Sequence, residues 1–403
     1  MNTLDTVAIV AALLTAVAVL PGTLGILMLT NKIAASPAGA RYIYFQSGAL
    51  VIFALLLLAY ALYQSALQGA WSTTVIVSAT ALLVLLIYGF LMHAKLLFRP
   101  VRNPVFVSID KALEKFGPDE EVVGVIDPNG DPYAFIARLA RRPHIVFQTK
   151  GDAPFIMTHC ILAHSSMSYA LEGGFENPDI TITAALANNM VFYDRNSRCS
   201  VVQIHNRLEG SNDPLSMVST VMTSLKTWQT LYPDSPVWMR PVEWRDMFYL
   251  KLLARADVID PNSPVMVYPL QHQLDDRLPM KSLVLGLVVD DQTRAYPADL
   301  VARQKVINDQ LGNSSLVIFC VDDYMQVFDN RLGPDHTLTF AASDQHGRFI
   351  DDESGSEWSA TGTCVSGTYE GRQLSTIPHY NKIFWYVWSD YYPGGEIFGD
   401  ESS

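Results

Sequence analysis

Hydrophobic residues are distributed very unevenly along this chain of 403 residues, and the pattern predicts two kinds of structure. Three apolar runs lie at about residues 7–30, 44–66 and 73–94. Each run reaches the roughly 20 residues that a helix needs to cross the hydrocarbon core of a membrane. The first run contains Pro21 and Gly22, where we expect the helix to kink. The pattern therefore predicts a membrane anchor of three helices in residues 1–94.

Beyond residue 104 the pattern changes to short runs that are rich in β-branched and aromatic residues and are separated by Pro, Gly, Asn and Asp. Such runs are typical of strands. The expected strands are EVVGVID, HIVFQ, PFIMTHC, SMSYAL, ITITAAL, MVFYD, SLVLGLVVD, SLVIFC, MQVFDN and TLTFAA. Helical spacing is clearest at residues 216–231 and recurs at 380–391. We therefore predict an α+β fold in which a β-rich region follows the three transmembrane helices.

The β-rich region contains an internal echo. The run VVGVIDPNGDPYAFIARL at 122–139 resembles VLGLVVDDQTRAYPADLV at 284–301, and FIMTHC at 155–160 resembles LVIFC at 316–320, which aligns Cys160 with Cys320. These matches keep one order, about 160 residues apart. They predict a pseudo-duplicated structure with a first lobe at 104–240, a Pro-rich connection at 241–275 and a second lobe at 276–398.

Charge is almost confined to the part of the chain after the anchor. Residues 1–94 contain only Asp5, Lys32 and Arg41 as formally charged side chains, and the remainder has a net charge of −13. This acidic balance excludes a strongly basic nucleic-acid-binding protein. The basic residues near the spans are Lys32 and Arg41 before the second span and Lys95, Arg99 and Arg102 after the third. Because basic flanks favour the cytoplasmic side, we expect the large domain to be cytoplasmic.

Several motifs in the β-rich region resemble one protein family. They are GVIDPNGDPYAF, HIVFQ, MTHCILAHSSMSYAL, MVFYDRNS, TWQTLYPD, DDRLPMKSLVLGL, RAYP, ESGSEWSATG and FWYVWSDYYP. In this order the set resembles the domain-of-unknown-function family 3179 over about residues 106–398. The resemblance implies no established activity. Members of the family commonly look exported, which favours an extracytoplasmic domain as the alternative to the cytoplasmic one.

The sequence departs from the family pattern at two points. The stretch that begins at Cys160 reads CILAH, where family members often have Cys-Pro-Leu-Cys or Cys-x-Leu-Thr. Val201 occupies a position where a Trp is expected, whereas its partner in the second lobe, Trp358, is present.

The candidate chemistry is concentrated near Cys160. A thiolate and imidazoles suit a transition metal, and we predict a site of Cys160 with His164 that recruits His205 or Cys199 from another segment. His159 is a less favoured ligand, because adjacent residues of a strand point to opposite faces. The competing interpretation is that Cys160 and Cys320 are buried thiols that pack as small hydrophobic residues.

The carboxylate clusters and the tryptophans have simpler interpretations. Acidic groups at Asp290-Asp291, Asp322-Asp323 and Asp351-Asp352-Glu353 are interpreted as solvated turns, since they lack a calcium-loop pattern. The aromatic segments that contain Trp228 and Trp388 are interpreted as core packing that closes each lobe.

Two functions are consistent with these patterns. The first is a multi-pass membrane protein that acts as a binding or accessory module of a membrane complex, with the lipid bilayer, other membrane subunits or a second copy of itself as partners. The alternative is a metal- or thiol-dependent enzyme or redox protein that uses the Cys/His site of the first lobe. The sequence does not decide between a catalytic and a non-catalytic protein.

Overall fold

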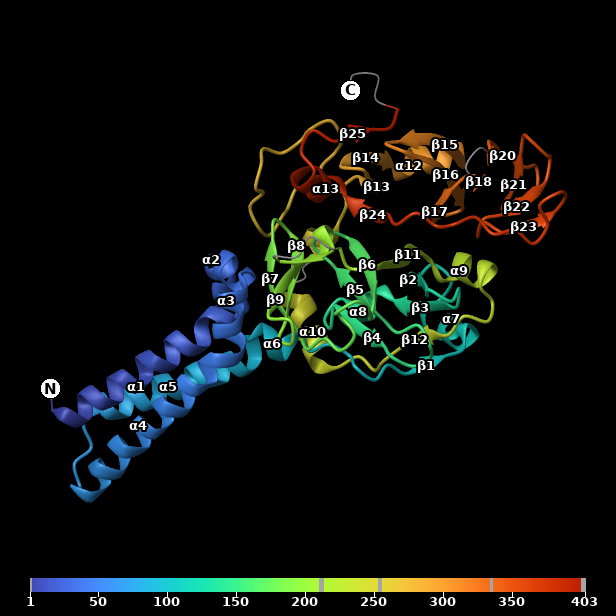
Figure 1. The fold of residues 1–403 in the computed structure, drawn as a ribbon. Helices are drawn as coiled ribbons and strands as arrows, with labels where there is room; N and C mark the ends of the chain where they lie inside the picture. The colour runs from blue at the N-terminus through green and yellow to red at the C-terminus, as the bar shows by residue number, and fades with distance from the viewer. Residues whose placement is uncertain (1, 210–213, 253–255, 334–335, 400–403) are drawn as a thin grey trace. The chain divides into compact units, whose positions relative to one another are not determined.

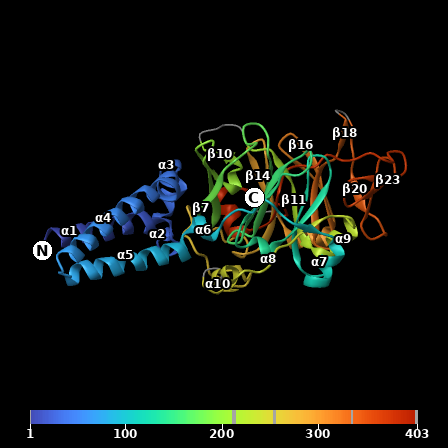
Figure 2. The ribbon, with the colours of Figure 1, turned by 90° about the horizontal axis from the view of Figure 1, so that it is seen from below.

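The computed structural model describes residues 2–209, 214–252, 256–333 and 336–399. The chain folds into two compact units, and Figures 1 and 2 show their helices and strands from two sides. Unit 1 comprises Met1–Pro100 and Gly174–Pro214, and unit 2 comprises Val101–Gly173 and Leu215–Ser403. Residues 174–214, which the sequence places within the first lobe, thus group with the apolar helices. The expected α+β fold with three long apolar N-terminal helices is confirmed.

Unit 1 is built from the apolar helices and one small sheet. Three of its segments are long and apolar enough to cross a membrane: Thr3–Gly22, Pro37–Leu67 and Thr73–Met92. Its helices are α1 Thr3–Val19, η1 Leu20–Gly22, α2 Leu24–Ala35, α3 Pro37–Arg41, η2 Tyr42–Gln46, α4 Ser47–Leu67, α5 Thr73–Met92, α6 Ala94–Leu97 and η3 Gln203–His205. Its sheet has the strand order β10-β9-β8-β7, from β7 Ile180–Leu186, β8 Asn189–Asp194, β9 Cys199–Val202 and β10 Arg207–Leu208.

Small side chains allow the helices of unit 1 to pack closely. Ala8, Ala11 and Ala18 on α1 are almost completely buried, as is Ala61 on α4. Close approach of helix backbones through small residues is typical of membrane helices. The large apolar residues of the same helices point outward instead, including Leu56 and Leu83. The outer faces of the bundle are therefore suited to contact lipid or other apolar helices.

The first apolar run does not form one helix. The kink expected at Pro21 and Gly22 is a full break, because a short 3₁₀ turn separates α1 from α2 there. A Cβ on Gly22 would lie 2.3 Å from the ring of His93, so only glycine fits at this crossing. The first span consequently ends at Gly22 rather than near residue 30, and α2 lies beyond it.

Side chains of the helices form hydrogen bonds with the backbone of β7, the edge strand of the sheet in unit 1. The amide of Asn31 on α2 donates to the carbonyl of Ala185 and accepts from its N–H, at 2.8 and 3.1 Å. The Tyr44 hydroxyl donates to the carbonyl of Thr183 at 2.5 Å. Unpaired groups on an edge strand are otherwise open to other chains. These bonds explain why residues 174–214 form one unit with the anchor.

The part of the first lobe that belongs to unit 2 forms an eight-stranded sheet with the order β1-β12-β3-β2-β11-β6-β5-β4. Its strands are β1 Phe106–Val107, β2 Glu121–Ile126, β3 Pro132–Ile136, β4 Ile145–Gln148, β5 Phe155–Cys160, β6 Ser165–Ala170, β11 Met217–Ser224 and β12 Val237–Trp238. Its helices are α7 Ile109–Phe116, α8 Ala137–Ala140 and α9 Leu225–Leu231, and the connection adds α10 Trp244–Leu252 and α11 Ala256–Ile259.

The second lobe contains sheets of order β24-β13-β14-β25, β15-β16-β17, β18-β19 and β20-β21-β22-β23. The strands are β13 Leu283–Val289, β14 Gln292–Pro297, β15 Val306–Leu311, β16 Ser314–Val321, β17 Tyr324–Asp329, β18 Arg331–Gly333, β19 His336–Thr337, β20 Phe340–Ala342, β21 Arg348–Asp351, β22 Glu357–Ser359, β23 Cys364–Ser366, β24 Tyr380–Phe384 and β25 Glu396–Ile397. Its helices are α12 Ala298–Gln304 and α13 Trp385–Tyr391. The order β25-β14-β13-β24 repeats the order β12-β3-β2-β11 of the first lobe.

Each of the two segments with predicted helical spacing begins as a strand and ends as a helix. Residues 216–231 contain strand β11 before helix α9, and residues 380–391 contain strand β24 before helix α13. β11 pairs with β2 on one side and β6 on the other, and its β-branched Val218 and Val221 suit a sheet. The prediction of helix was wrong for β11 and β24, because pairing with strands far away in the sequence decides their conformation.

One glycine and one tryptophan form the same contact in each lobe. A Cβ on Gly124 in β2 would lie 2.1 Å from the Trp228 ring, and a Cβ on Gly286 in β13 would lie 2.3 Å from the Trp388 ring. Both tryptophans are buried, as expected for core packing. Each helix thus rests its indole directly on the backbone of the neighbouring strand, which requires glycine there.

Candidate functional site

The turn that joins β5 to β6 carries the residues that the sequence singled out. The segment FIMTHC is a strand as expected, and its last residue, Cys160, pairs with Ser165 across a four-residue turn. The turn ends at His164, whose φ of 48° lies in the left-handed region that non-glycine residues seldom adopt. Such strained positions are found often at functional sites.

His164 forms an ion pair with Glu121, the first residue of β2. Its Nε2 lies 3.4 Å from the Glu121 carboxylate, and its Nδ1–H donates to the carbonyl of Lys382 at 2.8 Å. Burial disfavours the charged imidazolium of His164, but Glu121 and the Lys382 carbonyl outweigh burial and raise the pKa of His164 above its usual value. Burial likewise opposes the ionised form of Glu121, yet His164, His159 and Lys382 lower its pKa to about 2. Both shifts therefore favour the charged forms of this pair.

His159 is neutral at pH 7, whereas the surroundings of His164 favour its charged form. Burial, followed by the charge of His164, lowers the pKa of His159 to about 3. Its Nδ1 shares a hydrogen bond of 2.9 Å with the Ser166 hydroxyl. Phe155 and Met157, which alternate with His159 along β5, belong to the hydrophobic core of the lobe. His159 therefore points toward that core, and Cys160 points to the opposite face of the strand.

Cys160 is buried among tyrosines from three segments of unit 2. Burial raises the pKa of Tyr249, Tyr268, Tyr386 and Tyr391, and in each the charge of an ionised Cys160 raises it further. These tyrosines consequently keep their protons at neutral pH. A cysteine that acted only as a small hydrophobic residue would be expected among apolar groups.

The second lobe contributes Lys382 and Asp323 to the same region. Lys382 Nζ lies 3.6 Å from the Asp323 carboxylate, which also accepts from the Thr223 hydroxyl at 2.7 Å and the Ser224 N–H at 2.6 Å. Burial opposes ionisation of Asp323, but Lys382 and these donors lower its pKa. We use the name seam cluster for Glu121, His164, Asp323 and Lys382, because they connect the two lobes within unit 2.

The structure divides the predicted metal ligands between the two units. Cys160, His159 and His164 belong to unit 2, whereas His205 belongs to unit 1. Within the described residues there is no group of three or more His, Cys, Asp or Glu side chains that could hold a metal ion. All four cysteines are free thiols. Metal binding at Cys160, His164 and His205 therefore stays a prediction of the sequence.

The register of the strands corrects the alignment of Cys160 with Cys320. The N–H of His159 donates to the carbonyl of His144, and the N–H of Cys320 donates in the same way to the carbonyl of Lys305. Ile145 pairs with Thr158 where Val306 pairs with Phe319. The counterpart of Cys320 is therefore His159, one residue earlier than the echo indicated, and a shift by one residue exchanges the faces of a strand.

The acidic turns are only partly solvated. Asp290 and Asp291 form the exposed turn between β13 and β14, as expected. Asp351 is completely buried, and its carboxylate accepts hydrogen bonds from Ser354 and from the indole N–H of Trp358. The interpretation of Asp351 as solvated is thus wrong, because the turn after β21 folds over this carboxylate.

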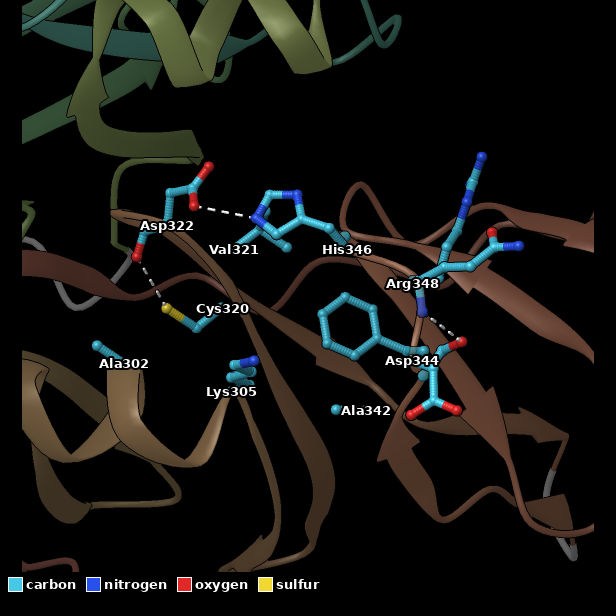
Figure 3. Close-up of a pocket in the computed structure, with 13 residues that line it drawn as sticks. Ala302, Lys305, Cys320, Val321, Asp322, Ala342, Asp344, His346 and Arg348 are labelled. Atoms are coloured by element: carbon cyan, nitrogen blue, oxygen red, sulfur yellow. Dashed lines mark hydrogen bonds and ion pairs between the residues drawn. The ribbon is translucent and has the colours of Figure 1, made fainter.

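A cavity of about 430 Å³ lies on the second lobe near Cys320 (Figure 3). Lys305 and Arg348 line it together with Asp322 and Asp344. In Figure 3 His346 faces Asp322, and its Nε2 is 3.0 Å from that carboxylate. Because cations and carboxylates are mixed in this cavity, its charge favours no class of ligand.

Sequence reasoning found Cys160 and His164 but missed Glu121, Lys382 and the tyrosines. Glu121 is the first residue of β2 and follows Glu120, and no local motif marks it. Tyr386 lies in the aromatic segment that was interpreted as core packing, although its hydroxyl donates to the carbonyl of Leu162 in the β5–β6 turn at 2.6 Å. The excess of tyrosine over phenylalanine in FWYVWSDYYP is the one signal that could have indicated polar neighbours.

The fold and site define a class of membrane protein with a large β-rich domain and a polar cluster between two lobes. Residues 99–395 match the DUF3179 family, which is described as a protein of unknown function. The match covers most of the chain, so the chain belongs to this family. No curated protein and no solved structure shows significant similarity to it.

Proposed function

We propose that this chain is a membrane-anchored binding or accessory module of a membrane complex, and that it engages its partner subunit at the seam cluster. The observation that carries this proposal is the ion pair of His164 and Glu121. Its side chains are 22% and 35% exposed, so a charged pair that both lobes hold in place remains accessible from outside. Perturbed ionisable groups held at strained positions are characteristic of functional sites.

The proposal includes an origin of the two lobes by internal duplication. The repeated strand order, the contact of Gly124 with Trp228 and the matching contact of Gly286 with Trp388 support a common ancestral unit. Reciprocal contacts also join the lobes, since β24 lies against β6 and β17 lies against β11. Under this proposal the boundaries at 104–240 and 276–398 mark the two copies, with residues 174–214 as the part of the first copy that packs on the anchor.

Purification of the full chain in mild detergent tests the association. We expect native mass spectrometry to show the chain together with other membrane subunits or with a second copy. The double variant Glu121→Gln/His164→Gln removes the ion pair and should release the partner while the melting temperature of the chain stays close to that of the wild type. Glu120→Gln is a matched control, because Glu120 pairs with Arg138 at 3.2 Å outside the seam cluster.

Two results would contradict the proposal. A wild-type chain that is always monomeric and free of partners would exclude an accessory role. Retention of the same partner by the double variant would show that binding occurs elsewhere.

Thiol-dependent chemistry at Cys160 is the second candidate function. It is favoured by the buried thiol of Cys160, whose ionised form would act on the protonated Tyr249, Tyr268 and Tyr391. Hydroxyl donors stabilise a thiolate, and the thiolate is the reactive form of cysteine.

Alkylation by iodoacetamide separates the two functions. If Cys160 is a reactive thiol, mass spectrometry should show it modified faster than Cys320, because burial raises the pKa of Cys320 to about 11. Equal and slow modification of both thiols, together with a metal content near zero, would leave the binding role alone.

A further inference from the structure

Unit 1 contains a cavity of about 420 Å³ between its helices and its sheet. One wall comes from Lys32 and Ser36, which lie at the end of α2 and the start of α3. The other walls come from Ser200 on β9 and from Arg207 on β10. The bonds from Asn31 to Ala185 hold α2 against this sheet, so the cavity is a fixed feature of unit 1.

The charges around this cavity favour a singly charged anion. Lys32 and Arg207 each bring a positive charge, and within the described residues neither forms an ion pair with a carboxylate. Glu209 is the only acidic residue among the described residues of the lining. Burial and the charge of Arg207 lower the pKa of His205, which also lines the cavity, and its imidazole is therefore neutral at pH 7. The lining therefore carries a net charge of about +1, which matches a phosphodiester.

Ser200 supplies independent evidence for a ligand. Its side chain is only 3% exposed, and its hydroxyl has no hydrogen-bond partner among the residues that the structure describes. A buried hydroxyl without a partner is unfavourable, and nearly all such groups in proteins are satisfied. Ser200 lines the cavity, where an anionic oxygen would accept its hydrogen bond.

The position of the cavity along the chain indicates where the anion comes from. Lys32 and Ser36 lie between the first span, which ends at Gly22, and the second span, which begins at Pro37. The third span ends at Met92 on this same side. Chain between two spans lies at the level of the lipid headgroups. Ala35 and Leu208 give the cavity apolar walls beside the cations, as the glycerol and upper acyl carbons of a lipid require.

We propose that this cavity binds the phosphate of an anionic phospholipid. Lys32 and Arg207 hold the charge of the phosphodiester, Ser200 donates a hydrogen bond to one of its oxygens, and the lipid thereby fixes the orientation of the β7–β10 sheet at the membrane surface. This site lies in unit 1 and is independent of the seam cluster, so the two proposals can fail separately.

Lipid retention by the full chain tests the proposal. The chain is delipidated in mild detergent, mixed with phosphatidylglycerol or phosphatidylcholine, and examined by native mass spectrometry. We expect the wild type to retain phosphatidylglycerol in preference. Lys32→Gln/Arg207→Gln should weaken this retention by about tenfold or more, because each basic residue near a membrane surface contributes substantially to binding of anionic lipid.

Two further variants separate a binding role from a structural one. Ser200→Ala should weaken retention of phosphatidylglycerol without lowering the melting temperature of the lipid-free chain, because it removes a hydroxyl that has no partner. Arg198→Gln removes one positive charge of unit 1 outside the cavity lining and should leave retention unchanged.

Three outcomes would overturn the assignment. They are equal retention of the two lipids by the wild type, unchanged retention in Lys32→Gln/Arg207→Gln, and displacement of phosphatidylglycerol by an equal concentration of inorganic phosphate. The last result would identify a site for a free anion instead of a lipid.

Discussion

The hairpin β5–β6 of the first lobe and the hairpin β16–β17 of the second lobe have the same place in similar sheets but different turns. The first turn has four residues and ends at His164, whereas the second consists of Asp322 and Asp323 alone. On the core-facing side, His159 in the first lobe corresponds to Cys320 in the second. The buried tyrosines lie near Cys160, whose counterpart is the apolar Val321.

This difference teaches that the framework and the chemistry of the lobes are separable. Contacts of glycine with tryptophan recur in both lobes, because each helix must pack on its strand. Charged groups of the seam cluster occur at the turns of these two hairpins. The two added residues of the β5–β6 turn change which side chains reach the seam cluster. A ligand site between the lobes therefore needs His164 from the first lobe alone. The second lobe supplies a different charged group, such as Lys382.

The largest effect is expected from the buried ion cluster that attaches the connection to the first lobe. Asp246 on α10 is 6% exposed and pairs with Arg142 and Arg240. Asp246→Ala leaves both guanidinium groups without this carboxylate, and we expect a loss of about 3–5 kcal/mol in the free energy of unfolding. Denaturant unfolding of the full chain, followed by tryptophan fluorescence, measures it. A loss below 1 kcal/mol would show that the connection does not stabilise the lobe.

The next largest effect should be equal in the two lobes. Gly124→Ala and Gly286→Ala each force a methyl group against a buried indole, and overpacking of this kind costs about 1–3 kcal/mol or more. Gly333→Ala is the control, because a Cβ there meets no atom within 4 Å. Thermal unfolding should show similar losses for the first two variants and almost none for the control. Strongly unequal losses would break the equivalence of the lobes.

The equivalent positions His159 and Cys320 should make the lobes sensitive to opposite extremes of pH. Burial lowers the pKa of His159 to about 3. The stability that depends on the neutral form of His159 is therefore fully present above pH 6.5 and is lost as the pH falls below that value. Burial raises the pKa of Cys320 to about 11, so its contribution is present below pH 9.0 and is lost as the pH rises through 11. Each group changes stability by at most about 1.4 kcal/mol per pH unit.

Unfolding measured across this pH range checks the prediction with two variants. His159→Gln should reduce the loss of stability in acid and leave the alkaline limb unchanged. Cys320→Ala should do the reverse. If each variant altered both limbs equally, the acid and alkaline losses of stability would not arise from His159 and Cys320.

The smallest effect is expected from the ion pair of Arg294 with the exposed Glu396 in the second lobe. Arg294 pairs with Asp309 and with Glu396, whose side chain is 53% exposed. Glu396→Gln should cost no more than about 1 kcal/mol, since solvent screens exposed pairs. Comparison with Asp246→Ala in the same unfolding assay tests whether burial, rather than the number of ion pairs, separates the lobes.

The sequence by itself determined the parts of this protein that depend on local patterns. The three apolar helices, the break at Pro21 and the strands with continuous β-branched runs follow from residue spacing, because the membrane and the sheet each impose a fixed period. Cys160 and His164 were identified for the same reason, since both lie within one short motif.

Only the tertiary structure decided the features that need segments far apart in the chain. It made strands of β11 and β24, because their partners lie on both sides, and it attached residues 174–214 to the anchor through Asn31 and Tyr44. It also brought Glu121 and Lys382 to His164. Their charged state and location depend on burial and on neighbours more than 40 or 200 residues away, which no local pattern encodes.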